Sequence, residues 1–245
     1  MIFSDTLQLA QQLDAQDPLR LFRDEFVISD PNTIYMDGNS LGRLPRRSKQ
    51  VLEQVITKEW GEQLINSWNE GWYERAAQVG GKIASLIGAH PDEVIVSDST
   101  SINLYKLAFA AIQQARHRFK VVSDEFNFPS DLYILQGILQ HMGPEYNLEL
   151  IPSRDGIHID STDVKSALDH NTSLLTLSHV SFKSAFQYDL QEITALAHEV
   201  GAWMLWDLSH SVGAVPIDLN KANVDLAIGC TYKYLNGGPG APAFL

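Results

Sequence analysis

Short apolar runs alternate with segments of helical spacing from residue 93 to residue 231. The runs are apolar on both faces, which is typical of strands in a mainly parallel sheet that helices cover on both sides. The sequence therefore predicts an α/β fold, a three-layer sandwich with a mainly parallel sheet. The expected strands are Glu93–Ser97, Phe119–Ser123, Leu148–Pro152, Leu174–Val180, Trp203–Asp207 and Leu226–Thr231. The helices expected between them are Ile102–Ala115, Ser130–Met142, Thr162–Leu168 and Leu190–Val200.

Residues 1–45 differ from the rest, since we expect an amino-terminal helical segment there, followed by a turn. Asp17–Phe26 begins with a capping aspartate and a proline and should form a helix. Thr33–Met36 should form a short strand, directly before the turn Asp37–Gly42. Residues 46–245 would then form one large domain. Within it, the helix that carries Val79, Ile83 and Ile87 on its apolar side is expected to end at Gly88, because glycine commonly closes a helix.

Charge and cysteine content narrow the range of partners and compartments. The formal net charge is −12 at pH 7, which argues against nucleic acid or an anionic membrane as the main partner. The single cysteine, Cys230, cannot form an internal disulfide and fits a reducing cytosol. No signal peptide is visible, and no apolar run is long enough to cross a bilayer. We therefore expect a cytoplasmic protein without a nucleic-acid or membrane partner.

Lys233 is the residue that most constrains the chemistry. It follows the apolar run Leu226–Cys230, lies between two tyrosines and precedes a glycine-rich turn. A lysine that is partly removed from water forms Schiff bases readily, because its pKa falls. Asp207 ends another expected strand, and a buried carboxylate there needs a partner such as a protonated pyridine nitrogen. A lysine and an aspartate in these two roles are typical of enzymes that use pyridoxal 5'-phosphate (PLP).

Thr100 and Ser101 lie between an expected strand and the expected helix Ile102–Ala115, at the carboxyl end of the strand, where ligands of parallel sheets bind. Their hydroxyls and the free amides of the first helical turn could hold a phosphate. The same residues could also form an ordinary helix cap. His210 could touch that phosphate or orient Asp207, although a lone histidine is more often structural.

Phe128 follows another expected strand and could stack on the flat ring of a cofactor. Ser130 and Asp131 come shortly after it and could contact the polar edge of that ring. Taken alone, this segment could be a helix cap beside Pro129. The combination is more specific, because a hydroxyl-rich helix start, an aromatic ring, a strand-end carboxylate and a lysine follow one another in the order that a PLP site needs. We predict no metal site.

Motifs along nearly the whole chain are shared with one enzyme family, namely Asp37–Gly42, Trp68-Asn69, Gly71-Trp72, Thr100–Leu104, Asn127–Asp131, Trp206–Ser211 and Gly229–Gly240. In these motifs the sequence resembles the kynureninases, especially the bacterial ones. The lysine segment and the Asp37–Gly42 turn are the most specific in combination. Kynureninases are fold-type I PLP enzymes, near the class V aminotransferases. The resemblance implies that residues 46–245 form the PLP-binding large domain of a fold-type I PLP-dependent transferase.

The resemblance also implies a role for each candidate residue. Lys233 would bind the cofactor as a Schiff base and later move protons, while Asp207 would bind the pyridine nitrogen. Tyr232 would help to hold the phosphate and could act as an acid. The other cofactor contacts that the resemblance implies are Thr100, Ser101, Phe128, Pro129, Ser130, Asp131, Ser178 and His210.

The implied reaction is hydrolysis of L-kynurenine, or of 3-hydroxykynurenine, to anthranilate, or 3-hydroxyanthranilate, and L-alanine. It would serve tryptophan catabolism or pyridine nucleotide biosynthesis, in a homodimer. The family continues past Leu245 with a small domain that supplies further substrate contacts. We therefore expect this sequence to be part of a longer protein.

Two alternatives stay open. The chain could be a truncated, non-catalytic PLP-binding homologue. It could also belong to another class V PLP enzyme, such as an aminotransferase or a cysteine desulfurase. A desulfurase needs a nucleophilic cysteine on a mobile loop, whereas Cys230 lies in an expected buried strand. We therefore disfavour the desulfurase.

Overall fold

The computed structural model describes residues 3–245, which separate into two compact units. The smaller unit consists of the described residues up to Met36 together with Arg43–Ser67. The larger unit consists of Asp37–Gly42 and Trp68–Leu245. The domain boundary that we expect between residues 45 and 46 stays a prediction. Each unit is described by itself below.

The smaller unit is helical. Its elements in chain order are α1 (Phe3–Gln16), η1 (Arg20–Glu25), α2 (Arg46–Gln54), η2 (Val55–Gln63) and the first residues of η3 (Leu64–Trp68). The helix expected at Asp17–Phe26 is present as the shorter 3₁₀ helix η1, and Asp17 Oδ1 accepts a hydrogen bond from the Leu19 amide at 2.8 Å.

The strand predicted at Thr33–Met36 is wrong, because these residues form no strand. Asp30 instead closes a local turn: its carboxylate accepts hydrogen bonds from the Asn32 amide at 2.9 Å and from the Thr33 hydroxyl at 2.6 Å. Local side-chain bonds of this kind compete with strand pairing. An apolar run alone does not make a strand when the chain before it turns and no neighbouring strand pairs with it.

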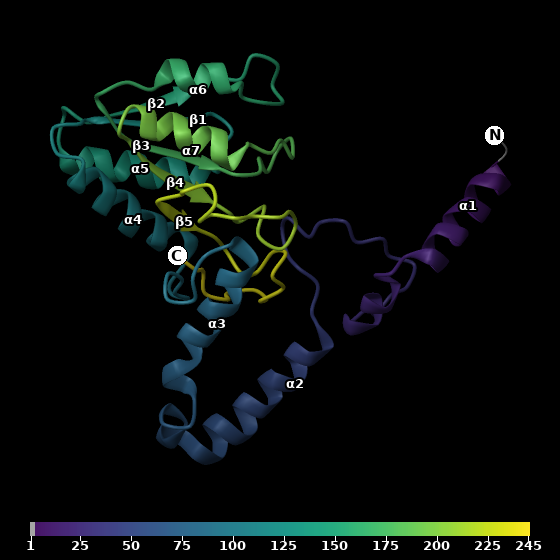
Figure 1. Ribbon diagram of the computed structural model, residues 1–245. Helices are drawn as coiled ribbons and strands as arrows, with labels where there is room; N and C mark the ends of the chain where they lie inside the picture. Colours follow the sequence, from purple (N-terminus) through teal and green to yellow (C-terminus); the bar gives the residue numbers. More distant parts are fainter. Residues whose placement is uncertain (1–2) are drawn as a thin grey trace. The chain divides into compact units, whose positions relative to one another are not determined.

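The larger unit contains a sheet of five parallel strands in the order β2-β1-β3-β4-β5 (Figure 1). The strands are β1 (Lys120–Asp124), β2 (Asn147–Ile151), β3 (Thr172–Ser178), β4 (Trp203–Asp207) and β5 (Leu226–Ile228). The predicted bounds of the first four agree within two residues, and β5 ends three residues earlier than predicted. The β5 residues give way to a loop that carries Lys233.

Helices cover both faces of this sheet, as Figure 1 shows. They are α3 (Trp72–Ile87), α4 (Thr100–Gln114), α5 (Pro129–Met142), α6 (Ser161–Ala167) and α7 (Leu190–Glu199). Buried residues of α4 and α5 pack with Leu174 and Leu205 on one face, and those of α6 and α7 pack with Leu175 and Met204 on the other. Adjacent strand residues therefore face opposite layers, and the predicted three-layer α/β sandwich is confirmed. In the described part of the chain no helix is long and apolar enough to cross a membrane.

The last residues of the sequence pair antiparallel with the segment predicted as the strand Glu93–Ser97. Residues 95–98 and 243–245 exchange four backbone hydrogen bonds of 2.8–3.0 Å, around a bridge between Val96 and Phe244. Phe244 also exchanges two backbone hydrogen bonds with Gly229, just after β5. The predicted segment is thus extended and paired, although it forms an isolated bridge rather than a full strand. This pairing brings residues 240–243 to the carboxyl end of β5.

Gly88 gives a direct test of this packing. It closes α3 with φ +66°, and a Cβ atom there would lie 2.6 Å from the Cα of Asp218. We expect Gly88→Ala to lower the free energy of unfolding by about 2–4 kcal/mol, through backbone strain and overpacking. Gly137→Ala is the matched control, because no atom lies within 4 Å of its Cβ position inside α5. It should raise that free energy by up to about 1 kcal/mol. Urea unfolding measures both, and equal effects would contradict the packing.

Candidate active site

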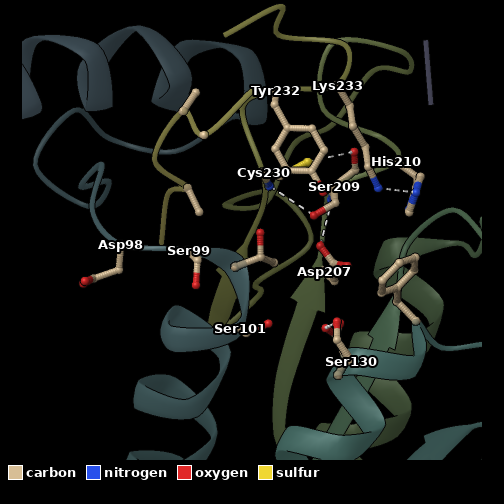
Figure 2. Close-up of a pocket in the computed structure, with 16 residues that line it drawn as sticks. Asp98, Ser99, Ser101, Ser130, Asp207, Ser209, His210, Cys230, Tyr232 and Lys233 are labelled. Carbon is tan, nitrogen blue, oxygen red and sulfur yellow. Dashed lines mark hydrogen bonds between the residues drawn. The ribbon is translucent and has the colours of Figure 1, made fainter. Parts of the chain in front are cut away.

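A cavity of about 350 Å³ lies where the loops after β4 and β5 meet the first turns of α4 and α5 (Figure 2). Nine of the eleven residues predicted for the site line it, namely Thr100, Ser101, Phe128, Ser130, Asp131, Asp207, His210, Tyr232 and Lys233. Pro129 and Ser178 are not among the lining residues. In Figure 2, Lys233 and His210 meet on one side of the cavity, and Ser99 and Ser101 lie on another side at the start of a helix.

Lys233 is buried, with 6% of its surface exposed, although it follows β5 in an irregular loop. Its Nζ atom lies 2.5 Å from Nε2 of His210. The same atom lies 5.4 Å from the ring centre of Phe128 and 5.7 Å from that of Tyr232. These distances fall within the range in which an ammonium is attracted to an aromatic face. The amine is therefore held between two rings and an imidazole inside the cavity wall.

His210 is neutral over the physiological pH range. Burial, and then the positive charge of Lys233, lower the pKa of His210 to about 4. A neutral imidazole can accept a hydrogen bond from the Lys233 ammonium at Nε2, which leaves the proton on Nδ1. Nδ1 is buried and has no hydrogen-bond partner. A ligand in the cavity could supply the missing acceptor.

Two aspartates lie at the carboxyl end of the sheet. Asp207 ends β4, is 4% exposed, and accepts a hydrogen bond at Oδ1 from the Ser209 amide at 2.8 Å. Asp131 lies in the first turn of α5 and is 3% exposed. Burial, and then the charge of Asp207, raise the pKa of Asp131 to about 8. Asp131 therefore keeps its proton at neutral pH and can donate a hydrogen bond, while its Oδ2 atom is buried without a partner.

The start of α4 presents backbone amides and hydroxyl groups to the cavity. Ser99, rather than Thr100 or Ser101, is the capping residue, and its hydroxyl accepts a hydrogen bond from the Ile102 amide at 3.4 Å. The amides of Thr100 and Ser101 belong to the first turn and have no partner inside the helix. The carboxylate of Asp98 forms an ion pair with Lys106, which offsets its negative charge. Free amides, hydroxyls and the helix dipole together favour a bound phosphate at this point.

Ser178 lies beneath the cavity wall instead of lining the cavity. Its hydroxyl donates a hydrogen bond to Oδ1 of Asn127 at 2.8 Å, and the same oxygen accepts one from the Phe128 amide at 2.8 Å. The Asn127 amide group donates in turn to Ser123 at 3.0 Å. This buried network fixes the backbone from which Phe128 enters the cavity. Pro129, also predicted for the site, is the first residue of α5.

Seven further lining residues were not among the eleven predicted for the site: Asp98, Ser99, Ser209, Cys230, Gly240, Ala241 and Ala243. The hydroxyl of Ser209 accepts a hydrogen bond from the Cys230 amide at 3.0 Å, and so ties the Asp207 loop to the segment before Lys233. Its position two residues after Asp207 was an available signal. Gly240, Ala241 and Ala243 reach the cavity through the pairing of residues 243–245 with residues 95–98. The apolar run at residues 241–245 indicates a strand, but it does not tell which distant segment pairs with it.

The pKa of Asp131 predicts a pH dependence of stability. In the folded chain Asp131 keeps its proton up to about pH 8, whereas an unfolded aspartate loses its proton near about pH 4. Between these values the folded state binds more protons, so this contribution to stability falls as pH rises. Asp131→Asn cannot ionise, and we expect it to make the fall in unfolding free energy between pH 5 and pH 8 shallower by up to about 1 kcal/mol per pH unit. Urea unfolding of the ligand-free chain at four pH values measures this, and parallel curves would contradict the assignment.

The comparisons with known proteins agree with this geometry. The family model described as aminotransferase class V matches residues 34–242. A curated kynureninase from Burkholderia mallei is 46% identical over 98% of this chain, and one from Pseudomonas fluorescens is 44% identical over 95%. The predicted resemblance to kynureninases is thus confirmed. The chain spans 57% and 55% of the length of these two relatives.

Solved structures show the same fold. A cysteine desulfurase from Escherichia coli matches with a TM-score of 0.76 over 94% of this chain and 57% of its own, at 17% identity. The apo cysteine desulfurase from Thermococcus onnurineus matches with a TM-score of 0.72 over 86% of this chain and 52% of its own, at 21% identity. Sequence identities this low show only that the fold is shared. With the family match over residues 34–242 and a parallel sheet that converges on a buried lysine, the chain belongs to the class V aminotransferase family.

Proposed function

We propose that this protein binds PLP at Lys233 and hydrolyses L-kynurenine, or 3-hydroxykynurenine, to anthranilate, or 3-hydroxyanthranilate, and L-alanine. One observation carries the proposal. The buried amine of Lys233, the Asp207 carboxylate and the free helix start of α4 line one cavity, in a chain 46% identical over nearly its whole length to a protein named kynureninase. The solved structures support only the fold.

The residues of the cavity fit PLP. The start of α4 offers amides and hydroxyls to the phosphate, Asp207 offers a carboxylate to the ring nitrogen, and Lys233 offers an amine to the aldehyde. Nδ1 of His210 and Oδ2 of Asp131 are buried polar atoms without partners, and such atoms are costly unless a ligand satisfies them. The volume of about 350 Å³ lies in the range of small-molecule sites, about 300–1,000 Å³.

When bound, PLP supplies an electron-withdrawing ring that stabilises negative charge on the carbons of an attached amino acid. Asp207 would keep the ring nitrogen protonated. Nζ of Lys233, once the substrate amine has replaced it, would take the proton from the substrate Cα atom. Burial raises the pKa of Tyr232, with Cys230 as the next cause, so its hydroxyl holds a proton that it can give to a carbon atom of the substrate. Phe128 would cover one face of the ring and exclude water from it.

The desulfurase alternative needs a thiolate that can reach the substrate. Cys230 is 2% exposed, and burial raises the pKa of its thiol. The backbone amide of Cys230 is also fixed by Ser209. The geometry therefore disfavours Cys230 as a mobile nucleophile.

The resemblance to kynureninases also supports three wider proposals. The protein would be a cytoplasmic homodimer. It would serve tryptophan catabolism or pyridine nucleotide biosynthesis. Residues 46–245 would form its PLP-binding large domain, preceded by the amino-terminal segment of residues 1–45.

Formation of anthranilate from L-kynurenine, followed by its fluorescence, tests the proposed reaction in the complete protein with PLP. Lys233→Ala should lower kcat by about 10³-fold or more, because the amine acts in both covalent binding and proton transfer. Cys230→Ala is the control and should keep most of the activity. Release of sulfide from L-cysteine, lost in Cys230→Ala, would favour a desulfurase instead. Binding of PLP without formation of anthranilate would favour a non-catalytic homologue.

A further inference from the structure

The loop that carries Lys233 is held at three successive carbonyl groups. The Gly237 amide donates to the carbonyl of Thr231 at 2.8 Å, and the Asn236 amide donates to that of Lys233 at 2.9 Å. Both bonds are local. The carbonyl of Tyr232, between them, accepts its bond from the Gly42 amide at 2.9 Å. The backbone before the reactive lysine therefore depends on a residue from a distant part of the sequence.

Only glycine fits at position 42. A Cβ atom there would lie 2.1 Å from the carbonyl oxygen of Lys233 and 2.4 Å from Oδ1 of Asn236. The carbonyl of Lys233 is itself held by Asn236, so it cannot move aside without breaking another bond. Gly38, in the same turn, approaches the ring of Tyr234, since a Cβ atom there would lie 3.2 Å from it. The turn therefore contacts the residues on both sides of Lys233.

The turn is shaped to aim the Gly42 amide. The amides of Ser40 and Leu41 both donate to the carbonyl of Asp37, at 3.0 and 3.1 Å, which closes the turn tightly. Residues 37–42 belong to the unit that contains the sheet and the cavity, whereas the residues directly before and after them belong to the other unit. The six residues are thus part of the site's own framework.

We propose that the Asp37–Gly42 turn positions Lys233, with Gly42 as the positioning residue. By holding the carbonyl of Tyr232, the turn fixes the direction in which the Lys233 side chain leaves the backbone, and so keeps Nζ against His210. The inference rests on the proposed function for the identity of the ligand, PLP. It accounts for a motif to which the reaction itself assigns no role.

Gly42→Ala tests the proposal, with Gly137→Ala as the matched glycine-to-alanine control. The measurements on the 245-residue chain are the affinity for PLP and the pH dependence of the visible absorption of PLP bound at Lys233. We expect Gly42→Ala to raise the Kd for PLP by about tenfold or more. We also expect it to shift the pH at which the visible absorption of bound PLP is half changed by about half a pH unit or more. Far-UV circular dichroism should stay unchanged. Gly137→Ala should match the unmodified chain in its Kd for PLP, in the pH midpoint of its absorption and in its far-UV circular dichroism.

Equal Kd and midpoint in Gly42→Ala and the unmodified chain would overturn the inference and leave the proposed function intact. Failure of the unmodified chain to bind PLP would count against the proposed function. Should Gly42→Ala fail to fold, hydrogen–deuterium exchange of the unmodified chain tests whether the Gly42 amide is held by the carbonyl of Tyr232. We expect the Gly42 amide to exchange slowly without PLP and more slowly with PLP. Exchange at the rate of an unstructured peptide would overturn the inference, whatever PLP does.

Discussion

Burial of the Lys233 amine is the constraint on which the rest of the site depends. Removing an ammonium from water is costly unless other groups replace the water. In the folded chain, Nζ of Lys233 lies 2.5 Å from Nε2 of His210 and faces the rings of Phe128 and Tyr232, and these contacts replace the lost water. The same burial keeps His210 neutral and Asp131 protonated, so that a single desolvated cavity sets the protonation of its acid and base groups.

The parallel sheet supplies the geometry that makes this burial possible. Parallel strands end at the same edge, and Asp207 is in register with Ser178 on one side and with Ile228 on the other. The sheet therefore places three features side by side at this edge: the Asp207 carboxylate at the end of β4, the loop after β5 and the network around Ser178. Helices on both faces exclude water from the sheet, and the first turn of α4 presents its free backbone amides at the same edge.

Much of this arrangement could be predicted from the sequence, because apolar runs and strand-end polar residues are local signals. The strand at Trp203–Asp207 was predicted at its observed bounds, and Asp207 and Lys233 both line the cavity. What could not be predicted depends on contacts between distant segments. The network of Ser178 with Asn127 and the bond from Gly42 to Tyr232 exist only in the folded chain. The apolar residues at Thr33–Met36 led to a wrong prediction of a strand, because a local turn at Asp30 precedes them and no strand among the described residues pairs with them.

The most direct test of the central claim is where PLP becomes attached. The purified chain would be mixed with PLP, reduced with borohydride, digested and mapped by mass spectrometry, with a visible absorption spectrum taken before and after reduction. A selective site of this kind predicts a visible band and a reduced adduct confined to Lys233, absent in Lys233→Ala. An adduct spread over exposed lysines such as Lys49 and Lys58, or no adduct in a chain shown to be folded, would contradict the account.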